Sequence, residues 1–482
     1  MAKILIAYPP GALYQRGEDR SQGNIENATA TSMRSANDLG YASSVLKKDG
    51  HETKLVDYQT ERLSIHDLLK DVATFFPDFI FFSITNSTIF QDLEIVNTIK
   101  TLNPNTKIIL KGSLFFNAPE PVIKQLDLKN VEALIGGESD FIISKLINSI
   151  IKNNEGIENI NGIFYKTPND KNVWKRTQFN SWEQDLDSLP FPDREAMNNY
   201  LYLRPDTGEP QATITTSRGC GAKCTYCLTP VISGTKIRYR TPENIYQELY
   251  ECYHKHGIKN FFFKSDTFTM NKHWVIELCE KITNSDLQGK IEWVANSRVN
   301  PLELETLKAM KKAGCWLVAY GFESGSEETL IKIRKGATIN HNLLARKMTE
   351  EAGLKCYGFF LIGLPWENET HLNATKKHIF DLNCDFIELH IAVPYHGTNL
   401  YNDAEEAKVI EITPIGKDYF NSPTIGTKYL NMKEIMHFRK KTLLQYHLRL
   451  SYIISRLFEA IKKPKILKNY AVFAYRLLKN NI

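Results

Sequence analysis

Short apolar runs alternate with amphipathic stretches of helical period over the first 150 residues. The candidate strands are Ile4–Ala7, Thr53–Val56, Phe79–Ile84, Lys107–Leu110 and Ala133–Ile135. A helical stretch ends near Asp49-Gly50, between the first two of these runs. Strands separated by helices predict a parallel sheet with crossover helices. We therefore expect a Rossmann-like domain over residues 1–150, with its ligand site beyond the carboxyl ends of the strands.

A second alternation of strands and helices spans residues 206–400. Its candidate strands are Ala212–Thr215, Asn260–Phe263, Glu292–Ala295, Leu317–Tyr320, Gly358–Ile362 and Phe386–Val393. Six consecutive βα units predict a partial (β/α)6 barrel of TIM type, in which residues at the carboxyl ends of the strands face the active site. The fold class is therefore α/β.

Two further regions differ from these alternating ones. Residues 151–205 carry clusters of Asn, Gly and Pro, and the prolines near residue 190 exclude a continuous helix or central strand, so we expect a connector with a small hairpin. Residues 401–482 are expected to form a helical region. From Lys433 onward, 12 Lys or Arg stand against two acids, Glu434 and Glu459, with apolar residues between them. This pattern fits a basic amphipathic element on an anionic membrane surface, or equally a helix packed on the barrel.

Composition places the chain among ordinary soluble proteins. It has 482 residues, a formal net charge of +5, 42% hydrophobic and 24% charged residues. That length favours two or three domains. We see no run of about 20 apolar residues and no signal-peptide cleavage pattern, so a cytoplasmic location is expected, with peripheral contact at the inner membrane face as the finer alternative.

Three of the eight cysteines fall within eight residues, directly after the first predicted barrel strand. Cys220, Cys224 and Cys227 follow a C-x3-C-x2-C spacing. Three thiolates on one loop can bind three irons of a 4Fe-4S cluster and leave the fourth iron open. A structural zinc site is the alternative, but zinc normally takes four protein ligands and no second Cys or His pair lies nearby. The other five cysteines are scattered and are expected to be buried apolar residues.

The spacing, with Tyr226 before the last cysteine, resembles the signature of the radical S-adenosylmethionine (SAM) superfamily. The resemblance implies a 4Fe-4S cluster that reductively cleaves SAM to give a 5′-deoxyadenosyl radical. It extends through the barrel, where each strand is followed by polar or glycine-containing residues. By resemblance, Ser265 and Asp266 hold the SAM amino group, Arg298 its carboxylate, Glu323 and Ser324 the ribose, and Gly363 the adenine.

His396 follows the sixth barrel strand, where relatives commonly have proline. A histidine at the mouth of a catalytic barrel is a candidate acid, base or ligand, so we predict a catalytic role for it. A structural role is the alternative.

The N-terminal domain resembles the cobalamin-binding domain of a large subclass of radical SAM enzymes. The resemblance implies a corrin at the carboxyl edge of the sheet. The predicted cofactor-binding residues there are Pro10, Ser83, Gly112, Gly136, Gly137 and Glu138. The chain has no D-x-H-x-x-G sequence, so that motif supplies no histidine to cobalt. A Rossmann-like domain that binds no corrin is the alternative.

The subclass resemblance implies methylation of an unactivated carbon in a lipid or secondary metabolite, most similar to hopanoid and related lipid-modifying enzymes. Ring rearrangement or cyclisation without methyl transfer is the alternative reaction, and a cobalamin-binding sensor is the alternative of another class. A methylthiotransferase is disfavoured because residues 1–219 contain no cysteine for a second cluster. Expected partners are a small-molecule or lipid-like substrate and an electron donor such as flavodoxin or ferredoxin, with no nucleic acid.

Overall fold

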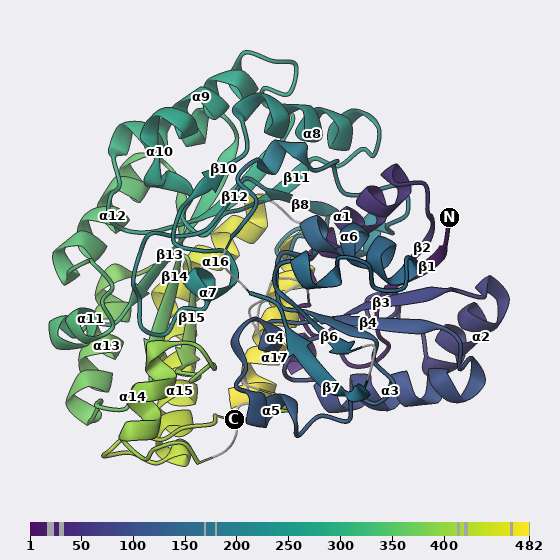
Figure 1. Cartoon of the computed structure of the whole chain (residues 1–482). Coiled ribbons are helices and arrows are strands. Elements are labelled where there is room, and N and C mark those ends of the chain that lie inside the picture. Colours follow the sequence, from purple (N-terminus) through teal and green to yellow (C-terminus); the bar gives the residue numbers. More distant parts are fainter. Residues whose placement is uncertain are drawn as a thin grey trace.

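A computed structural model describes residues 1–16, 24–27, 33–167, 170–178, 181–411, 415–418, 423–462 and 466–481. The described chain contains two large sheets, one in each half, and a set of C-terminal helices (Figure 1). The α/β class predicted from the alternating pattern is confirmed.

The first sheet has the strand order β2-β1-β3-β4-β5-β6-β7. Its strands are β1 (Lys3–Tyr8), β2 (Glu52–Asp57), β3 (Phe79–Ser83), β4 (Lys107–Lys111), β5 (Ala133–Ile135), β6 (Ile163–Thr167) and β7 (Asp170–Arg176). β1 to β5 run parallel to one another. The predicted apolar runs coincide with these five strands because β1, β3, β4 and β5 are buried on both faces, which requires continuous apolar sequence, while the edge strand β2 is buried only in its second half.

Helices cover both faces of this sheet. They are α1 (Asn37–Lys48), α2 (Ile65–Phe75), α3 (Ile89–Leu102), α4 (Leu114–Asn117), α5 (Glu120–Ile123) and α6 (Ser139–Ile151). Short 3-10 turns lie at Ile25–Asn27 and Ile157–Asn159. α1 and α6 pack on each other and share one apolar cluster with β1, whereas α3 belongs to a second cluster on the opposite face. The Rossmann-like layering is therefore present.

An antiparallel hairpin extends the first sheet beyond residue 150. β6 pairs with β5, and β7 pairs with β6. The hairpin expected in the connector is thus present, and it joins the sheet of the preceding domain. The domain boundaries at residues 150, 205 and 400 stay predictions.

The second sheet has six parallel strands in the order β15-β14-β13-β12-β11-β8. They are β8 (Gln211–Thr215), β11 (Asn260–Lys264), β12 (Glu292–Ser297), β13 (Cys315–Glu323), β14 (Lys355–Ile362) and β15 (Phe386–Ile391). Each strand pairs with the next along the chain, as the six predicted βα units require. The strands curve within an outer arc of helices (Figure 1). A small antiparallel pair, β9 (Ser217–Arg218) and β10 (Arg238–Tyr239), follows the first strand.

The outer helices begin at side chains that cap free backbone amides. The helices of this half are α7 (Thr229–Ile232), α8 (Pro242–His254), α9 (Lys272–Thr283), α10 (Leu304–Lys312), α11 (Glu327–Lys332), α12 (Ile339–Glu351), α13 (Glu369–Leu382) and α14 (Asn399–Glu406). Further 3-10 turns lie at Leu186–Ser188, Asn199–Leu201 and Phe268–Met270. Thr241, Asn271 and Ser326 each accept a hydrogen bond from an amide in the first turn of the helix that they start. These caps place the βα loops, and hence the strand ends, at one rim of the barrel.

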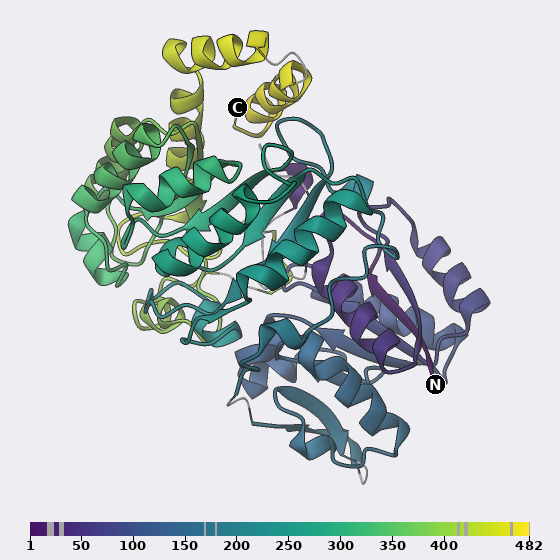
Figure 2. The same cartoon turned by 90° about the horizontal axis from the view of Figure 1, so that it is seen from above.

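Three helices complete the described chain: α15 (Met432–His447), α16 (Leu450–Lys462) and α17 (Leu467–Asn481). The prediction of a helical C-terminal region is confirmed. α15 packs on β15, and its Tyr446 hydroxyl donates to the Cys384 carbonyl over 2.5 Å. α16 and α17 stand out from the body of the protein (Figure 2). None of the helices in the described residues is both long enough and apolar enough to span a bilayer.

Candidate active site

The cysteine loop leaves the small β9 strand and ends at α7, directly beyond the first barrel strand. Cys220 and Cys224 are buried, and Cys227 is half-buried. Gly219 starts the loop with φ +90°, and a Cβ there would lie 2.2 Å from the Lys236 carbonyl oxygen. Only glycine fits this position, so the turn that brings Cys220 inward depends on this residue of the sequence.

Asp266, at the end of the second barrel strand, holds this loop in place. Its Oδ2 accepts from the Gly219 amide over 3.0 Å, and its Oδ1 accepts from the Thr229 hydroxyl over 3.1 Å. The Thr229 amide in turn donates a hydrogen bond to the Cys227 sulfur over 3.4 Å. Asp266 was predicted to bind SAM; the structure shows it bound to both ends of the cysteine loop while it also lines the cavity described next.

One cavity of about 1310 Å³ brings the cysteines and the strand ends together. Among the predicted site residues, those that line it are Cys220, Cys224, Tyr226, Cys227, Asp266, Arg298 and Glu323. Burial raises the pKa of the Cys220 thiol. Among the described residues, no three His, Cys, Asp or Glu side chains meet in the arrangement expected for a single metal ion. Three cysteines from one loop that line a large cavity supply the donor set of a three-thiolate iron-sulfur cluster, with space in the cavity for a further ligand.

Beside the cysteine loop, Glu323 and Arg298 form a polar cluster with Lys335. The Lys335 ammonium lies 2.6 Å from a Glu323 carboxylate oxygen and 3.4 Å from the Tyr226 hydroxyl. The Arg298 guanidinium donates to the Lys335 carbonyl and points Nη1 at the Cys224 sulfur over 3.5 Å. Burial, and then Glu323, raise the pKa of Tyr226. The cluster thus offers a carboxylate and a guanidinium on the cavity wall beside the cysteines.

A local irregularity in β13 aims Glu323 at the cavity. The register between β13 and β14 shifts between Gly321 and Glu323, and Glu323 has φ +65°. A bulge of this kind re-aims a side chain at a strand end, and a non-glycine residue keeps such a φ only where its contacts compensate the strain. The Lys335 ion pair is such a contact.

Three predicted SAM residues have their side chains or amides engaged elsewhere and do not line the cavity. The Ser265 hydroxyl lies 2.6 Å from that of Ser217. The Ser324 hydroxyl is fully buried, 3.0 Å from that of Thr375. Gly363, at φ +82°, donates its amide to Glu367 over 2.8 Å. Their predicted contacts with SAM stay predictions.

His396 also lies outside the cavity wall. Its ring packs on Tyr401 with centroids 4.4 Å apart, and burial lowers the pKa of the imidazole. The backbone of its neighbour Tyr395 turns there, and Tyr395 itself lines the cavity. The catalytic role of His396 therefore stays a prediction, because no contact between His396 and the cysteine cavity supports it.

Sequence reasoning missed a polar group on the opposite cavity wall. The Tyr357 hydroxyl donates to Glu388 over 3.2 Å, and the His390 Nε2 lies 3.7 Å from the same carboxylate. All three line the cavity, together with the ring of Phe359, which stacks on Tyr357. The signal was present: alternate residues of β15 share one face, and Glu388 and His390 are two apart. Lys335 had no such signal, because it lies in a turn after α11.

The predicted cobalamin residues cluster at the carboxyl edge of the first sheet. Gly137 and Glu138 line a pocket of about 80 Å³ there. Pro10, Ser83, Gly112 and Gly136 do not line it. The Ser83 hydroxyl donates to Asp38 over 2.7 Å, and a Cβ on Gly136 would lie 2.0 Å from the Phe115 carbonyl oxygen. Gly136 therefore allows close packing of the α4 backbone, whichever ligand the edge binds.

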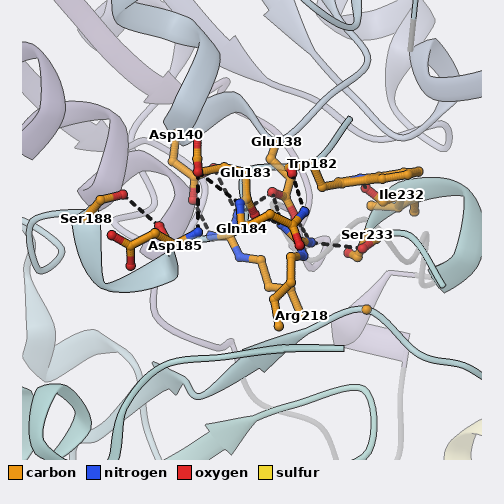
Figure 3. Close-up of polar contacts among 12 residues, drawn as sticks. Glu138, Asp140, Trp182, Glu183, Gln184, Asp185, Ser188, Arg218, Ile232 and Ser233 are labelled. Atoms are coloured by element: carbon orange, nitrogen blue, oxygen red, sulfur yellow. Dashed lines mark hydrogen bonds and ion pairs between the residues drawn. The ribbon is translucent and has the colours of Figure 1, made fainter. Parts of the chain in front are cut away.

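Charged residues from the barrel close this edge. Arg238 donates both terminal nitrogens to the Glu138 carboxylate, over 2.8 and 2.6 Å. Arg218, two residues before Cys220, donates to Asp140 over 3.1 Å and lies 3.6 Å from Glu138, and Figure 3 shows its guanidinium between these two acids. Although burial opposes it, Arg218 keeps the pKa of Asp140 below its usual value. The first domain is thus linked by ion pairs to the residues that flank the cysteine loop.

The chain was compared with known families. Residues 214–379 match the Radical SAM superfamily. These residues contain the cysteine loop and reach from β8 into α13. The prediction made from the cysteine spacing is confirmed: residues 214–379 match the radical SAM family, and the protein is a radical SAM enzyme.

Its relatives extend the likeness over both halves. The uncharacterized methyltransferase PH0819 of Pyrococcus horikoshii is 28% identical over 457 residues, 95% of either chain. The radical SAM methyltransferase TsrM from Kitasatospora setae, with cobalamin and a [4Fe-4S] cluster bound, has a TM-score of 0.66 at 15% identity, over 86% of this chain and 76% of TsrM. The cobalamin-dependent radical enzyme OxsB, with aqua-cobalamin and SAM bound, has a TM-score of 0.66 at 17% identity, over 93% of this chain and 61% of OxsB. These structural likenesses show that the two-domain fold is shared.

Proposed function

We propose that the protein uses a 4Fe-4S cluster on Cys220, Cys224 and Cys227 to cleave SAM reductively. The observation that carries the proposal is that these cysteines share one cavity with Arg298 and Glu323. When bound, the cluster supplies one electron to the sulfonium of SAM, whose cleavage gives methionine and a 5′-deoxyadenosyl radical that takes a hydrogen atom from the substrate.

The residues of this chain bind and orient the reactants. Arg298 presents a guanidinium for the SAM carboxylate, in a charge-assisted hydrogen bond. Glu323 accepts from ribose hydroxyls, and Lys335 holds that carboxylate in place by its 2.6 Å contact. Asp266 contributes by holding the cysteine loop, through Gly219 and Thr229, at the strand end where SAM binds.

We further propose that the reaction is methylation of an unactivated carbon with the help of cobalamin. Support comes from the two-domain likeness to TsrM and OxsB, which bind cobalamin, and from the methyltransferase name of the Pyrococcus relative. Cobalamin, when bound, would supply the chemistry for passing a methyl group from SAM to the substrate carbon.

The structure tests where a corrin could be held. The 80 Å³ pocket at the sheet edge has room for a few waters, since a water takes about 30 Å³. The large cavity exceeds the roughly 300–1,000 Å³ of drug-sized sites, and first-domain loop residues Leu13, Met33 and Thr60 line it together with the cysteines. We therefore propose that a corrin would lie against these loops.

Partners and location follow from the same chemistry. A radical SAM enzyme acts on a substrate and needs a reductant, for which we propose a flavodoxin or ferredoxin in the cytoplasm. The substrate we propose is lipid-like, and the basic C-terminal helices are proposed to touch the inner membrane face.

Anaerobic reconstitution tests the cluster. The wild-type protein should bind about four irons and release 5′-deoxyadenosine from SAM. Replacing the three loop cysteines together with Ala should abolish both, whereas Cys279→Ala, in the buried core behind β12, should keep both. Iron and SAM cleavage that survive the triple replacement would refute the proposal.

Gel filtration tests the cobalamin. A corrin spectrum should stay with the protein under reducing and oxidising conditions. If the corrin separates from the protein under both, cobalamin-dependent methyl transfer is wrong while the cluster chemistry stands.

A further inference from the structure

The apolar residues of the last two helices have two different surroundings: some line the large cavity and others do not. α16 and α17, here called the arm, project from the barrel (Figure 2). Within α16, Ala460 is the one residue whose side chain the structure shows as buried. A helix of this composition normally hides its apolar stripe against a core.

The outer face of α16 exposes a continuous apolar stripe. Leu450, Ile454, Phe458 and Ile461 are 73%, 42%, 62% and 73% exposed. Their spacing of four, four and three residues places them on one side of the helix. None of them lines the large cavity. Removing such side chains from water is favourable, so this stripe is a strong candidate for contact with an apolar phase.

The inner face of the arm is a wall of the large cavity. The arm residues that line it include Ile453, Leu457, Ala460, Val472, Phe473 and Leu477. Leu457 is 51% exposed, and Arg456, Asn469, Tyr470 and Arg476 of the arm line the same cavity. One cavity thus joins the cysteines and Arg298 to a largely apolar wall on the arm.

Ion pairs at the base fix how the arm is oriented. Arg456 donates to Asp385 over 3.1 Å, next to the start of β15. Glu459 binds Arg456 over 2.9 Å, accepts from the Tyr470 hydroxyl of α17 over 3.0 Å, and also pairs with Lys355. These contacts fix the rotation of α16, so that Leu457 and Ala460 line the cavity while the adjoining stripe does not.

The charge of the arm indicates which kind of apolar phase its exposed stripe would contact. Lys462, Lys468 and Lys479 are exposed. Both acids of the C-terminal segment are occupied: Glu434 caps α15, and Glu459 is held in the ion pairs above. Exposed lysines beside an outward apolar stripe fit an anionic lipid surface.

We propose that the arm lies on an anionic bilayer and that the substrate is a membrane lipid whose apolar chain enters the cavity along the inner face of the arm. The part on the substrate rests on the proposed function. The outer stripe binds the bilayer, while the inner face receives the chain and leaves the reacting carbon near the cysteines.

Vesicle cosedimentation tests the outer face. Full-length protein should sediment with phosphatidylglycerol vesicles, weakly with phosphatidylcholine vesicles, and less in 0.5 M salt. Ile454→Asp/Phe458→Asp should lower binding at least tenfold. The control is Phe76→Asp, because Phe76 is 70% exposed in the first domain. Absence of binding to phosphatidylglycerol, or equal loss in both variants, would overturn the proposal. So would light scattering that shows a dimer lost in the arm variant, since a second copy would then cover the stripe.

Binding of a dansyl-labelled long-chain fatty acid tests the inner face. Fluorescence should rise on binding to the reconstituted protein without vesicles. Leu457→Asp should weaken this binding at least tenfold and keep cluster content, whereas Ile454→Asp/Phe458→Asp should leave it unchanged. Unchanged binding in Leu457→Asp would overturn the lipid-chain assignment. Because neither SAM cleavage nor methylation is measured, this failure is distinguishable from failure of the proposed function.

Discussion

Glu138 joins the first domain to the barrel by charge, and its removal should loosen the cysteine loop. Its carboxylate, 8% exposed at the side chain, accepts two hydrogen bonds from Arg238 and lies 3.6 Å from Arg218. Glu138→Gln keeps the shape and removes the charge. Arg238, 2% exposed, then keeps only the carbonyls of Glu183 and Ser233 as acceptors of full strength.

The magnitude follows from burial. Breaking a buried pair by removing one partner costs about 3–5 kcal/mol, because a buried charge is left without compensation. Arg218 keeps Asp140, so the lower figure applies. About 3 kcal/mol corresponds to a rise of about 100-fold in the population of locally opened states.

Hydrogen exchange at backbone amides measures this opening segment by segment. In Glu138→Gln, exchange should accelerate about 100-fold at residues 133–151 and 217–240 and stay unchanged in β13 to β15. Glu120→Gln is the control, because its ion pair with Lys124 is exposed and worth about 0–1 kcal/mol.

A double replacement separates charge from shape. Glu138→Gln/Arg238→Gln should exchange more slowly than the sum of the two single variants predicts, since neither charge is then left unpaired. Additive effects, or protection within threefold of wild type in Glu138→Gln, would show that the ion pair does not hold the two halves together.

Two further predictions concern the SAM side of the barrel. Burial raises the pKa of Glu367 to about 7, although the hydrogen bonds that its carboxylate accepts from two amides and one hydroxyl act to lower it. Since the folded pKa lies above the unfolded one, its stabilisation is present below about pH 4.5 and is lost as pH rises through 7. The melting temperature of wild type should therefore fall relative to Glu367→Gln between pH 5 and 8; parallel profiles would contradict the shift. Lys335→Gln should weaken SAM binding about tenfold in equilibrium dialysis, because Glu323 loses the cation that orients it. Lys332→Gln, an exposed lysine on α11, should not, and equal affinities in both variants would remove Lys335 from the site.

Local sequence determined the elements and the reactive loop. Buried parallel strands need continuous apolar runs, so both series of strands could be placed from the pattern alone. The three thiolates lie within eight residues, so their shared loop follows from spacing. Gly219 indicates the backbone turn at the start of this loop, because a side chain there would collide with the Lys236 carbonyl.

Tertiary structure decided which polar side chains reach the cavity. Ser265 and Ser324 end barrel strands as predicted, yet each hydroxyl lies against another hydroxyl in the core. A bulge in β13 directs Glu323 to Lys335, and 100 residues separate Arg238 from Glu138. Strand order and register bring such pairs together, and side-chain direction depends on neighbours distant in the chain. The sequence pattern shows the period of a helix or strand and the spacing of residues within a loop. The partner of a buried charge is decided only when the two sheets pack against each other.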